Sequence, residues 1–512
     1  MKKLSKLKIR VVVLLGAFMA IFYGLNYAED NYERFPAQFN VTDLNGNNGF
    51  VINGISSGDS CGRIVAMAGD VNGDGIDDIL LSAPLALKMA GQTYVVFGSH
   101  QPWPPEFYLS NLNGNNGFTI NGVNFNDASG FALSGAGDVN GDGLADILIG
   151  ATRKNNGHGQ SYVLFGSKQP WPAVINLQDL NGKNGFAING PAGSLNNGHT
   201  LSMAGDINGD GLEDIIIGAP GNVGKDQGRG YLIFGNKGPW AAIFNLENLD
   251  GNNGFLIYDI SKHADTGWCV SKAGDVNSDG IADMLISDSE FQNEVGQIYV
   301  IFGHKGQWPS NISIDTLNGN NGFIINGIHQ LDATGDSLNN PGDVNGDHID
   351  DILIGAPGFN SYSGASFIIF GHKGPWSDTF NLTNVNGTNG FIINGIHSND
   401  FSAVALSRAG DINDDGILDI LIGANDAYQS AGQSYIVFGS KSPWPTNFNL
   451  ANLNGNNGFA INGVALDISG WSVSGTGDIN GDGIADFIIG AIGPLGLAAT
   501  PGRVYVIFGQ HQ

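Results

Sequence analysis

The sequence predicts an all-β protein, a seven-bladed β-propeller of four-stranded blades whose ring is closed by an N-terminal outer strand that completes the last blade. Three observations predict this fold class. An acidic phrase, GDVNGDGLADILIGA in its second copy, occurs seven times at intervals of 67 to 69 residues. Each repeat also contains short segments rich in Val, Ile, Phe and Tyr between Gly, Asn and Pro clusters, which is typical of strands. A fixed period along the chain indicates a solenoid, a propeller or an array.

The repeat length and the two chain ends select the closed propeller. A repeat of 68 residues accommodates about four strands of five to six residues with their connections, which is one propeller blade. The phrase LNGNNGF begins at Leu44, before the first acidic phrase, and no copy follows the final VYVIFG segment. We therefore expect residues 37–54 to pair outside Val504–Phe508 in the last blade, which leaves no open edge in the ring.

The N-terminal segment has the features of an export signal. MKKLSKLKIR carries five positive charges, and the apolar run VVVLLGAFMAIF follows it, as in a secretory signal. We predict a signal peptide at 1–28, a short linker at 29–36 and a single propeller at 37–512. The alternative is a retained membrane anchor, because 11–28 is nearly long enough to span a bilayer. Both alternatives predict a secreted or cell-surface protein.

Charge and cysteine content limit the possible partners and crosslinks. The chain has 48 Asp and Glu residues against 22 Lys and Arg, a net charge of −26. A nucleic-acid partner is excluded on this ground, because phosphate binding requires a positive surface. Cys61 and Cys269 lie in different repeats at different repeat positions, so we expect two unpaired core thiols.

The acidic phrase has the ligand pattern of a calcium loop. In the second copy, oxygen-bearing side chains stand at positions 1, 3, 5 and 9 (Asp138, Asn140, Asp142 and Asp146), and Leu144 at position 7 offers its backbone carbonyl. Hard oxygen ligands in this number suit Ca²⁺, and the absence of Cys and His from the pattern disfavours Zn²⁺. The first six residues match the EF-hand loop, but the last acid is at position 9 and a strand follows at once, so the loop joins two strands of a hairpin.

Seven such loops predict up to seven Ca²⁺ ions. The alternative is seven metal-free Asp, Asn and Gly turns, but the 21 carboxylates of these loops would repel one another by roughly 1 kcal/mol per close pair. The fifth loop has His348 where the other six have Gly at position 6, so we expect the weakest site there. The predicted metal ligands are Asp70, Asn72, Asp74, Ile76, Asp78, Asp138, Asn140, Asp142, Leu144, Asp146, Asp206, Asn208, Asp210, Leu212, Asp214, Asp275, Asn277, Asp279, Ile281, Asp283, Asp343, Asn345, Asp347, Ile349, Asp351, Asp411, Asn413, Asp415, Ile417, Asp419, Asp478, Asn480, Asp482, Ile484 and Asp486.

These residues resemble FG-GAP repeats, the units of the seven-bladed propeller of integrin α-subunits. The resemblance is carried by DxNxDGxxDILIGAP and covers nearly the whole chain after the N-terminal segment. It implies calcium in the loop between the first two strands of each blade, on one face of the disc, and it implies adhesion. The GAP triplet is intact at 218–220 and 355–357 and lost at 287–289, where Ser-Asp-Ser stands.

The chain shows no catalytic constellation, because its repeated Asp residues are assigned to metal and no His recurs with a Ser or Cys partner. We therefore predict a calcium-binding adhesion or protein-interaction module and no enzyme. The segments between LIGAP and QxYVVFG vary most among the repeats, so we place the extracellular partner, a protein or a glycan, on the face opposite the calcium loops. The alternative is a lectin-like propeller that binds glycans between blades, and a less favoured one is an accessory protein of a hydrolase system.

A repeated tryptophan bears on the lectin alternative. Six repeats carry a Trp beside a Pro before LNGNNGF: Trp103, Trp171, Trp240, Trp308, Trp376 and Trp444. An exposed row of indoles would suit sugar binding. We favour the other interpretation, in which each indole packs between blades beside a turn fixed by proline.

Overall fold

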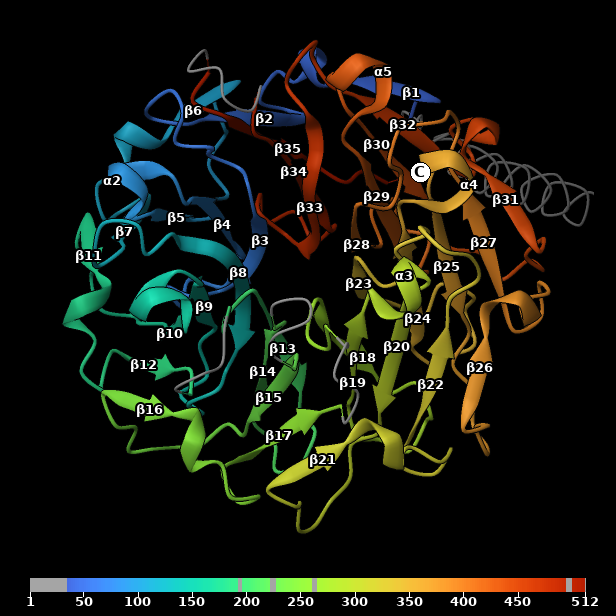
Figure 1. Ribbon diagram of the computed structural model, residues 1–512. Helices are drawn as coiled ribbons and strands as arrows, with labels where there is room; N and C mark the ends of the chain where they lie inside the picture. Colours follow the sequence, from blue (N-terminus) through green and yellow to red (C-terminus); the bar gives the residue numbers. More distant parts are fainter. Residues whose placement is uncertain (1–34, 192–195, 222–226, 260–264, 494–499, 512) are drawn as a thin grey trace, which may run out of the picture.

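Seven sheets are arranged as blades around a central axis in the computed structural model, which confirms the predicted propeller (Figure 1). The structure describes residues 35–511 except 192–195, 222–226, 260–264 and 494–499. The predicted signal peptide at 1–28 and most of the linker at 29–36 lie outside the described residues. Within the described part, no helix is long and apolar enough to cross a bilayer.

The first and second strands of each blade form the hairpin that carries the acidic loop. The innermost strands are β3 (Val65–Gly69), β8 (Ser129–Gly137), β13 (Thr200–Gly205), β18 (Val270–Gly274), β23 (Leu338–Gly342), β28 (Ala405–Gly410) and β33 (Ser469–Gly477). The second strands are β4 (Asp78–Ala83), β9 (Asp146–Ala151), β14 (Asp214–Ala219), β19 (Asp283–Asp288), β24 (Asp351–Ala356), β29 (Asp419–Ala424) and β34 (Asp486–Ala491). Every residue of the second strands is buried, because neighbouring blades cover both sides of each strand.

Two further antiparallel strands complete the four that the sequence predicts. The third strands are β5 (Gln92–Val96), β10 (Gln160–Leu164), β15 (Arg229–Ile233), β20 (Gln297–Ile301), β25 (Ala365–Ile369), β30 (Gln433–Val437) and β35 (Arg503–Ile507). The fourth strands are β7 (Gly117–Asn121), β12 (Gly185–Asn189), β17 (Gly254–Tyr258), β22 (Gly322–Asn326), β27 (Gly390–Asn394), β32 (Gly458–Asn462) and β2 (Gly49–Asn53). The hydrophobic core lies between adjacent blades; one cluster, for example, joins Leu80 of the first blade to Ile147 of the second.

Each blade has a fifth strand, which corrects the prediction of four-stranded blades. These strands are β11 (Val174–Asn176), β16 (Ile243–Asn245), β21 (Asn311–Ser313), β26 (Thr379–Asn381), β31 (Asn447–Asn449), β1 (Gln38–Asn40) and β6 (Glu106–Tyr108). Each belongs to the next repeat and pairs in parallel with the fourth strand, as β11 does with β7. Three residues with mostly exposed side chains give no strand signal in a sequence, so only the pairing reveals them.

The N-terminal segment contributes to two blades. Strand β2 pairs antiparallel with β35 of the seventh blade, where Gly49 lies opposite Ile507, as expected for residues 37–54. Strand β1 instead pairs in parallel with β32 of the sixth blade, which corrects that part of the expectation. The reason is that every fifth strand pairs with the fourth strand of the preceding repeat, so β1 lies one blade before β2.

Short helical turns connect the strands. Turns η1 (Val41–Asp43), η2 (Leu109–Asn111), η4 (Leu177–Asp179), η5 (Leu246–Asn248), η6 (Ile314–Thr316), η7 (Leu382–Asn384) and η8 (Leu450–Asn452) follow the fifth strands. Turns α2 (Ala86–Met89), η3 (Lys154–Gly157), α3 (Phe291–Glu294), α4 (Phe359–Tyr362) and α5 (Ala427–Ser430) follow the second strands. The latter set lies on the face away from the acidic loops, so the most variable segments form one face of the disc.

Candidate metal loops and the opposite face

The seven acidic loops share one backbone-to-side-chain hydrogen-bond pattern. In the first loop, Asp70 Oδ1 accepts from the backbone N–H groups of Gly73 at 2.6 Å and Asp74 at 3.1 Å, and Oδ2 accepts from Gly75 N–H at 2.9 Å. Asn72 Oδ1 accepts from Asp74 N–H, and Asp74 Oδ1 accepts from Ile76 N–H. The bonds to positions 5, 6 and 7 recur in all seven loops. Asp and Asn at positions 1, 3 and 5 therefore fold each loop around their own oxygens.

The aspartate at position 9 is the buried anchor of each loop. Asp78 is 0% exposed, and its two oxygens accept from the backbone N–H groups of Val71 and Gly98, both at 3.0 Å. Burial raises the pKa of Asp78 to about 8, and the neighbouring Asp74 and Asp70 add to the rise. The other six loops repeat this arrangement. Each loop thus holds a buried carboxyl next to two further acids, which favours a nearby cation.

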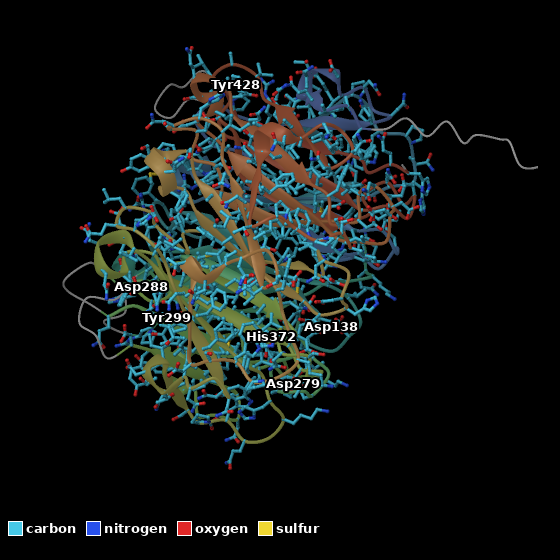
Figure 2. All side chains as sticks on the ribbon, turned by 90° about the vertical axis from the view of Figure 1, so that its right-hand side faces the viewer. Asp138, Asp279, Asp288, Tyr299, His372 and Tyr428 are labelled. Atoms are coloured by element: carbon cyan, nitrogen blue, oxygen red, sulfur yellow. The ribbon has the colours of Figure 1, made fainter. Side chains whose placement is uncertain are left out.

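The oxygen ligands of each loop suit a hard cation, but the acidic side chains alone do not complete a metal site. Every donor is oxygen, and a carboxylate that accepts two hydrogen bonds keeps lone pairs for a metal. Among the described residues, however, no three or more His, Cys, Asp or Glu side chains form a group that could hold a metal by themselves. An ion in these loops would also need the Asn oxygen of position 3 and the carbonyl of position 7. The hairpin location on one face is as the sequence predicts: Asp138 and Asp279 lie on one side of the disc and Asp288 on the other (Figure 2).

Two loop positions require a left-handed backbone, and sequence reasoning found only one of them. His348, at position 6, has φ +69°, and its N–H donates to Asp343 Oδ2 as Gly75 N–H does to Asp70. Position 4 is also left-handed, and there Ser278 and Asp414 have φ +57° and +56°. Five of the seven loops carry Gly at position 4, which is the signal that could have revealed it. The fourth, fifth and sixth loops therefore each carry one strained residue.

Replacing His348 by Gly should improve the fifth loop. The equivalent Gly residues have no atom within 4 Å of an added Cβ, and the His348 side chain is 93% exposed. Besides relaxing the backbone, the change therefore removes only the 3.8 Å contact of His348 Nδ1 with Asp343 Oδ2. Relief of a left-handed conformation contributes about 1 kcal/mol, equivalent to a severalfold gain in calcium affinity at one site.

The measurement is thermal unfolding of His348→Gly with saturating calcium and with chelator, since the extra freedom of Gly in the unfolded chain is the same in both. The gain should appear in calcium only. Gly143→His in the second loop is the matched reverse change and should produce the opposite shift. Equal shifts with and without calcium would show that His348 does not limit ion binding.

The face opposite the acidic loops contains a buried acid, Asp288, that has no counterpart in the other blades. Asp288 ends β19 where the other six blades have Ala. It is 0% exposed, and neither carboxylate oxygen makes a well-formed hydrogen bond to a described residue. Burial raises the pKa of Asp288 to about 7, Asp265 and Asp259 add to the rise, and nearby backbone N–H groups offset part of it. In the fourth repeat, the loss of the GAP triplet therefore replaces its Ala with a buried acid.

The raised pKa of Asp288 predicts a pH-dependent stability. Because burial raises the folded-state pKa above the unfolded value of 3.8, ionisation of Asp288 destabilises the fold. The penalty is absent below pH 3.8, grows as the pH rises toward about 7 and is complete above it. Asp288→Ala should therefore stabilise the protein at pH 8 by on the order of 3 kcal/mol and much less at pH 5. Unfolding curves at both pH values test this, with the exposed Asp378→Asn as control. A gain of the same size at both pH values would contradict it.

The repeated tryptophans pack between blades, which confirms the interpretation favoured from sequence. Their indoles stack on the Phe residues of the preceding LNGNNGF segments, with centroids 3.9 to 4.7 Å apart. Phe35 takes the seventh position and stacks on Phe459 at 4.4 Å, so Phe35-Pro36 is a seventh copy of the element that sequence reasoning missed.

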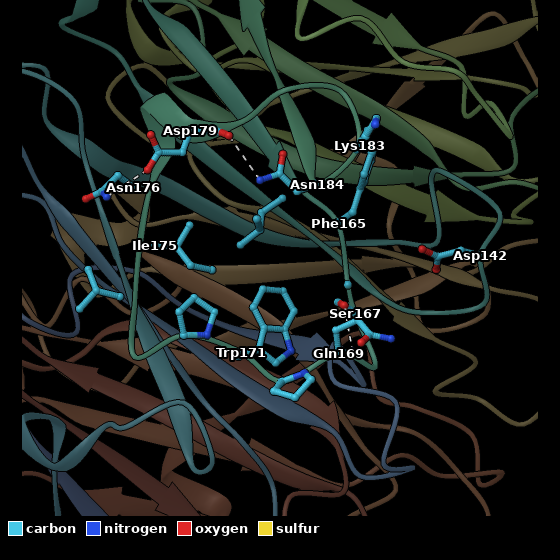
Figure 3. Close-up of a pocket in the computed structure, with 15 residues that line it drawn as sticks. Asp142, Phe165, Ser167, Gln169, Trp171, Ile175, Asn176, Asp179, Lys183 and Asn184 are labelled. Atoms are coloured by element: carbon cyan, nitrogen blue, oxygen red, sulfur yellow. Dashed lines mark hydrogen bonds between the residues drawn. The ribbon is translucent and has the colours of Figure 1, made fainter.

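Four pockets of about 350 to 560 Å³ lie beside these tryptophans. The one at Trp171 is bordered by Asp142, Asp179, Lys183 and Asn184 (Figure 3). Trp308 and Trp376 are only 5% and 8% exposed, and the other four indoles are half-buried, each with one face stacked on Phe. A row of open sugar-stacking faces is therefore absent from the described part. Both cysteines are free thiols, as expected, with Cys61 buried and Cys269 half-buried.

Comparison with known proteins identifies the repeats. The family described as FG-GAP repeat matches residues 62–96, 129–164, 197–233, 340–369, 406–437 and 469–507. The fourth blade, which holds Asp288, is not among these matches.

Two groups of proteins are found among the curated relatives. Integrin alpha-2 of Bos taurus is 31% identical over 164 residues, 31% of this chain and 13% of that protein. Integrin alpha pat-2 of Caenorhabditis elegans is 31% identical over 241 residues, 45% and 18% of the two chains. Phosphatidylinositol-glycan-specific phospholipase D of Homo sapiens is 26% identical over 332 residues, 61% and 37% of the two chains. The chain thus covers between about one eighth and two fifths of each of these relatives.

Proposed function

Because this chain is an FG-GAP repeat protein with an integrin-like seven-bladed propeller, we propose that it is an exported, calcium-binding module for adhesion or protein interaction. The observation that carries the proposal is that the two faces of the disc differ in how much their loops vary between blades. One face presents seven near-identical acidic loops, and the other presents turns that differ from blade to blade. Variable loops on a rigid scaffold are where binding specificity usually lies.

Calcium has a structural role in this proposal. Up to seven ions would be held by side chains at positions 1, 3, 5 and 9 and by the carbonyl of position 7. A bound ion supplies charge neutralisation within each hairpin, while the loop residues orient the oxygens and fix the turn between the first two strands. We assign no catalytic step to the chain, since its repeated acids already accept hydrogen bonds from the loop backbone.

The relatives support an extracellular location. We propose that residues 1–28 direct export and that 29–36 is a linker, with a retained anchor at 11–28 as the alternative. The phospholipase D relatives keep open the less favoured role as an accessory protein of a hydrolase system. A glycan-binding role is favoured by one observation, the recurrence of similar pockets beside Trp103, Trp171, Trp308 and Trp444.

The experiment is a pull-down on cell-surface proteins run beside a glycan array, each with calcium and with chelator. Calcium-dependent capture of a protein without glycan signal supports the interaction module. Calcium-dependent glycan binding that is lost in Trp171→Ala supports the lectin alternative. Absence of both signals, or binding unaffected by chelator, contradicts the proposal.

A further inference from the structure

Exposed apolar side chains are concentrated on one face of the disc. Eleven large apolar side chains of the described residues are exposed, and three of them, Tyr108, Val174 and Ile243, lie in fifth strands at the outer rim. The other eight, hereafter the apolar tips, lie in turns away from the acidic loops and are 38 to 71% exposed. The apolar tips are Ile55, Leu85, Leu87, Phe125, Leu331, Tyr362, Tyr428 and Leu466. Such a concentration on one side is typical of an interaction surface.

Strand direction places all eight apolar tips on the face opposite the acidic loops. Four belong to the turns after second strands, at or next to α2, α4 and α5. The other four lie between a fourth strand and the innermost strand of the next blade, as Phe125 does between β7 and β8. Tyr428 accordingly lies on the same side as Asp288 in Figure 2, and α2, α4 and α5 are spread around the disc in Figure 1. None of the apolar tips borders the pockets beside the tryptophans, so they form separate projections.

Five of the apolar tips have a left-handed backbone, which disfavours large side chains. Leu331 and Leu466 have φ +69° and +65°. They stand directly before a repeated Asp, where three other blades have Gly58, Asn126 and Asn399. Gly and Asn adopt this conformation at lower cost. An exposed Leu here adds strain and gains no buried area, so it does not stabilise the fold, and an apolar contact outside the chain would account for it.

The two faces of the disc also differ in charge. The Asp residues at position 5 are exposed in all seven acidic loops. On the turns of the opposite face, the exposed Lys, Arg, Asp and Glu residues of the described part are Lys88, Arg153, Glu294 and Asp426, whose charges sum to zero. Both cations lie in the first two blades, where Ala128 N–H donates to Met89 C=O and joins their turns.

This distribution of charge is complementary to a layer of lipid headgroups in one orientation. Headgroup phosphates attract Lys and Arg and repel acidic side chains. Lys88 and Arg153 stand beside three of the apolar tips, Leu85, Leu87 and Phe125, without an exposed acid on the described turns of these two blades. The acidic loops would be repelled by the same surface, so only the face with the apolar tips suits it.

We propose that this face docks on a phospholipid bilayer, with the apolar tips inserted between the headgroups and Lys88 and Arg153 in contact with lipid phosphates. Separate projections suit a bilayer, because lipids close around each inserted side chain, whereas a protein partner would need a pocket for each. The acidic loops then point away from the membrane. The inference goes beyond the interaction role proposed above, because it assigns the apolar tips a lipid contact that needs no partner protein.

The test is co-sedimentation of the calcium-loaded protein with vesicles of phosphatidylcholine, with and without phosphatidylserine. Because the apolar run at 11–28 can bind lipid by itself, the full chain is compared with one that starts at residue 29. In both, Leu87→Ser combined with Phe125→Ser should weaken binding roughly tenfold or more relative to the parent. The matched control is Val174→Ser combined with Ile243→Ser at the rim, which should leave binding unchanged.

Two further variants separate lipid binding from folding and from charge. Leu466→Asn introduces the residue that two other blades have at this position, so it should weaken vesicle binding without lowering the melting temperature. Lys88→Gln combined with Arg153→Gln should weaken binding to the vesicles with phosphatidylserine more than to those without it.

No sedimentation of the chain that starts at residue 29 with either vesicle would overturn the proposal. An unaffected Leu87 and Phe125 double variant, or an equal loss in the rim control, would also overturn it, since lipid would then meet another surface such as the calcium-loaded loops. Loss of protein capture in the double variant without any vesicle binding would assign the apolar tips to a protein. The vesicles contain no protein, so a failed pull-down contradicts the proposed function and leaves this result unchanged.

Discussion

Deleting residues 29–54 should unfold the propeller or lower its melting temperature by about 10 °C or more. The deletion removes β1 from the sixth blade and β2 from the seventh. It also removes Phe35, Val41, Phe50 and Ile52, which are at most 6% exposed. Burying each such side chain contributes about 1.5 to 3 kcal/mol, so the sum approaches the whole stability of a typical domain, about 5 to 15 kcal/mol.

A permuted variant separates loss of the strands from loss of the chain end. In the other repeats the repeated Trp lies six positions after the Phe of the Phe-Gly pair that follows the third strand, as from Phe165 to Trp171. Joining Gln512 directly to Arg34 gives the same spacing from Phe508 to Phe35. Fusion of 34–54 after Gln512 should therefore restore the melting temperature, and deletion of 29–34 alone should have no effect. A 29–54 deletion that melts like the full protein would contradict closure by these strands.

Removing calcium should destabilise the protein by several kcal/mol. A ligand that binds only the folded state adds about 2.7 kcal/mol per site at a hundredfold excess over its Kd. Seven ions would also place fourteen positive charges among loops of a chain with net charge −26. In chelator, the carboxylates at positions 1 and 5 repel each other, and the buried position-9 groups, whose pKa is raised by burial, have only backbone donors. We expect a lower melting temperature and protease cleavage first within the acidic loops.

Two controls accompany the chelation experiment: one compares calcium with magnesium, and the other removes a ligand from a single loop. Calcium restored in excess should reverse the shift fully, whereas magnesium should restore less, because it requires a more regular octahedral shell. Asp142→Asn, at position 5 of one loop, should reduce the calcium-dependent part of the stability by about one site's share. Identical unfolding curves with calcium and with chelator would rule out a structural role for the metal.

Much of the architecture follows from repetition in the sequence. The period predicts seven blades, and the position of the acidic phrase between two apolar runs predicts the hairpin loops, because such a phrase cannot be buried. The orphan LNGNNGF segment predicts the exchange of β2. The left-handed position of His348 follows from the Gly that the other six loops carry there.

Other features were not accessible from one repeat at a time. The fifth strands are three residues long and mostly exposed, so their existence depends on the neighbouring blade. The seventh copy of the Trp element, at Phe35, was not predicted because Phe stands there in place of Trp. The contacts of Arg63 with Phe131 and Trp471 join residues 68 and 408 positions apart, and only ring closure brings the last of these close.

The most direct test of the central claim is the number of Ca²⁺ ions bound per chain, measured by elemental analysis and calcium titration on chelator-stripped and reloaded protein. We expect seven ions at saturation, with the fifth loop among the last to fill and His348→Gly shifting that site to higher affinity. Retention of less than one ion per folded chain at saturating calcium would contradict it, and the acidic phrases would then be metal-free turns held by their own Asp and Asn side chains.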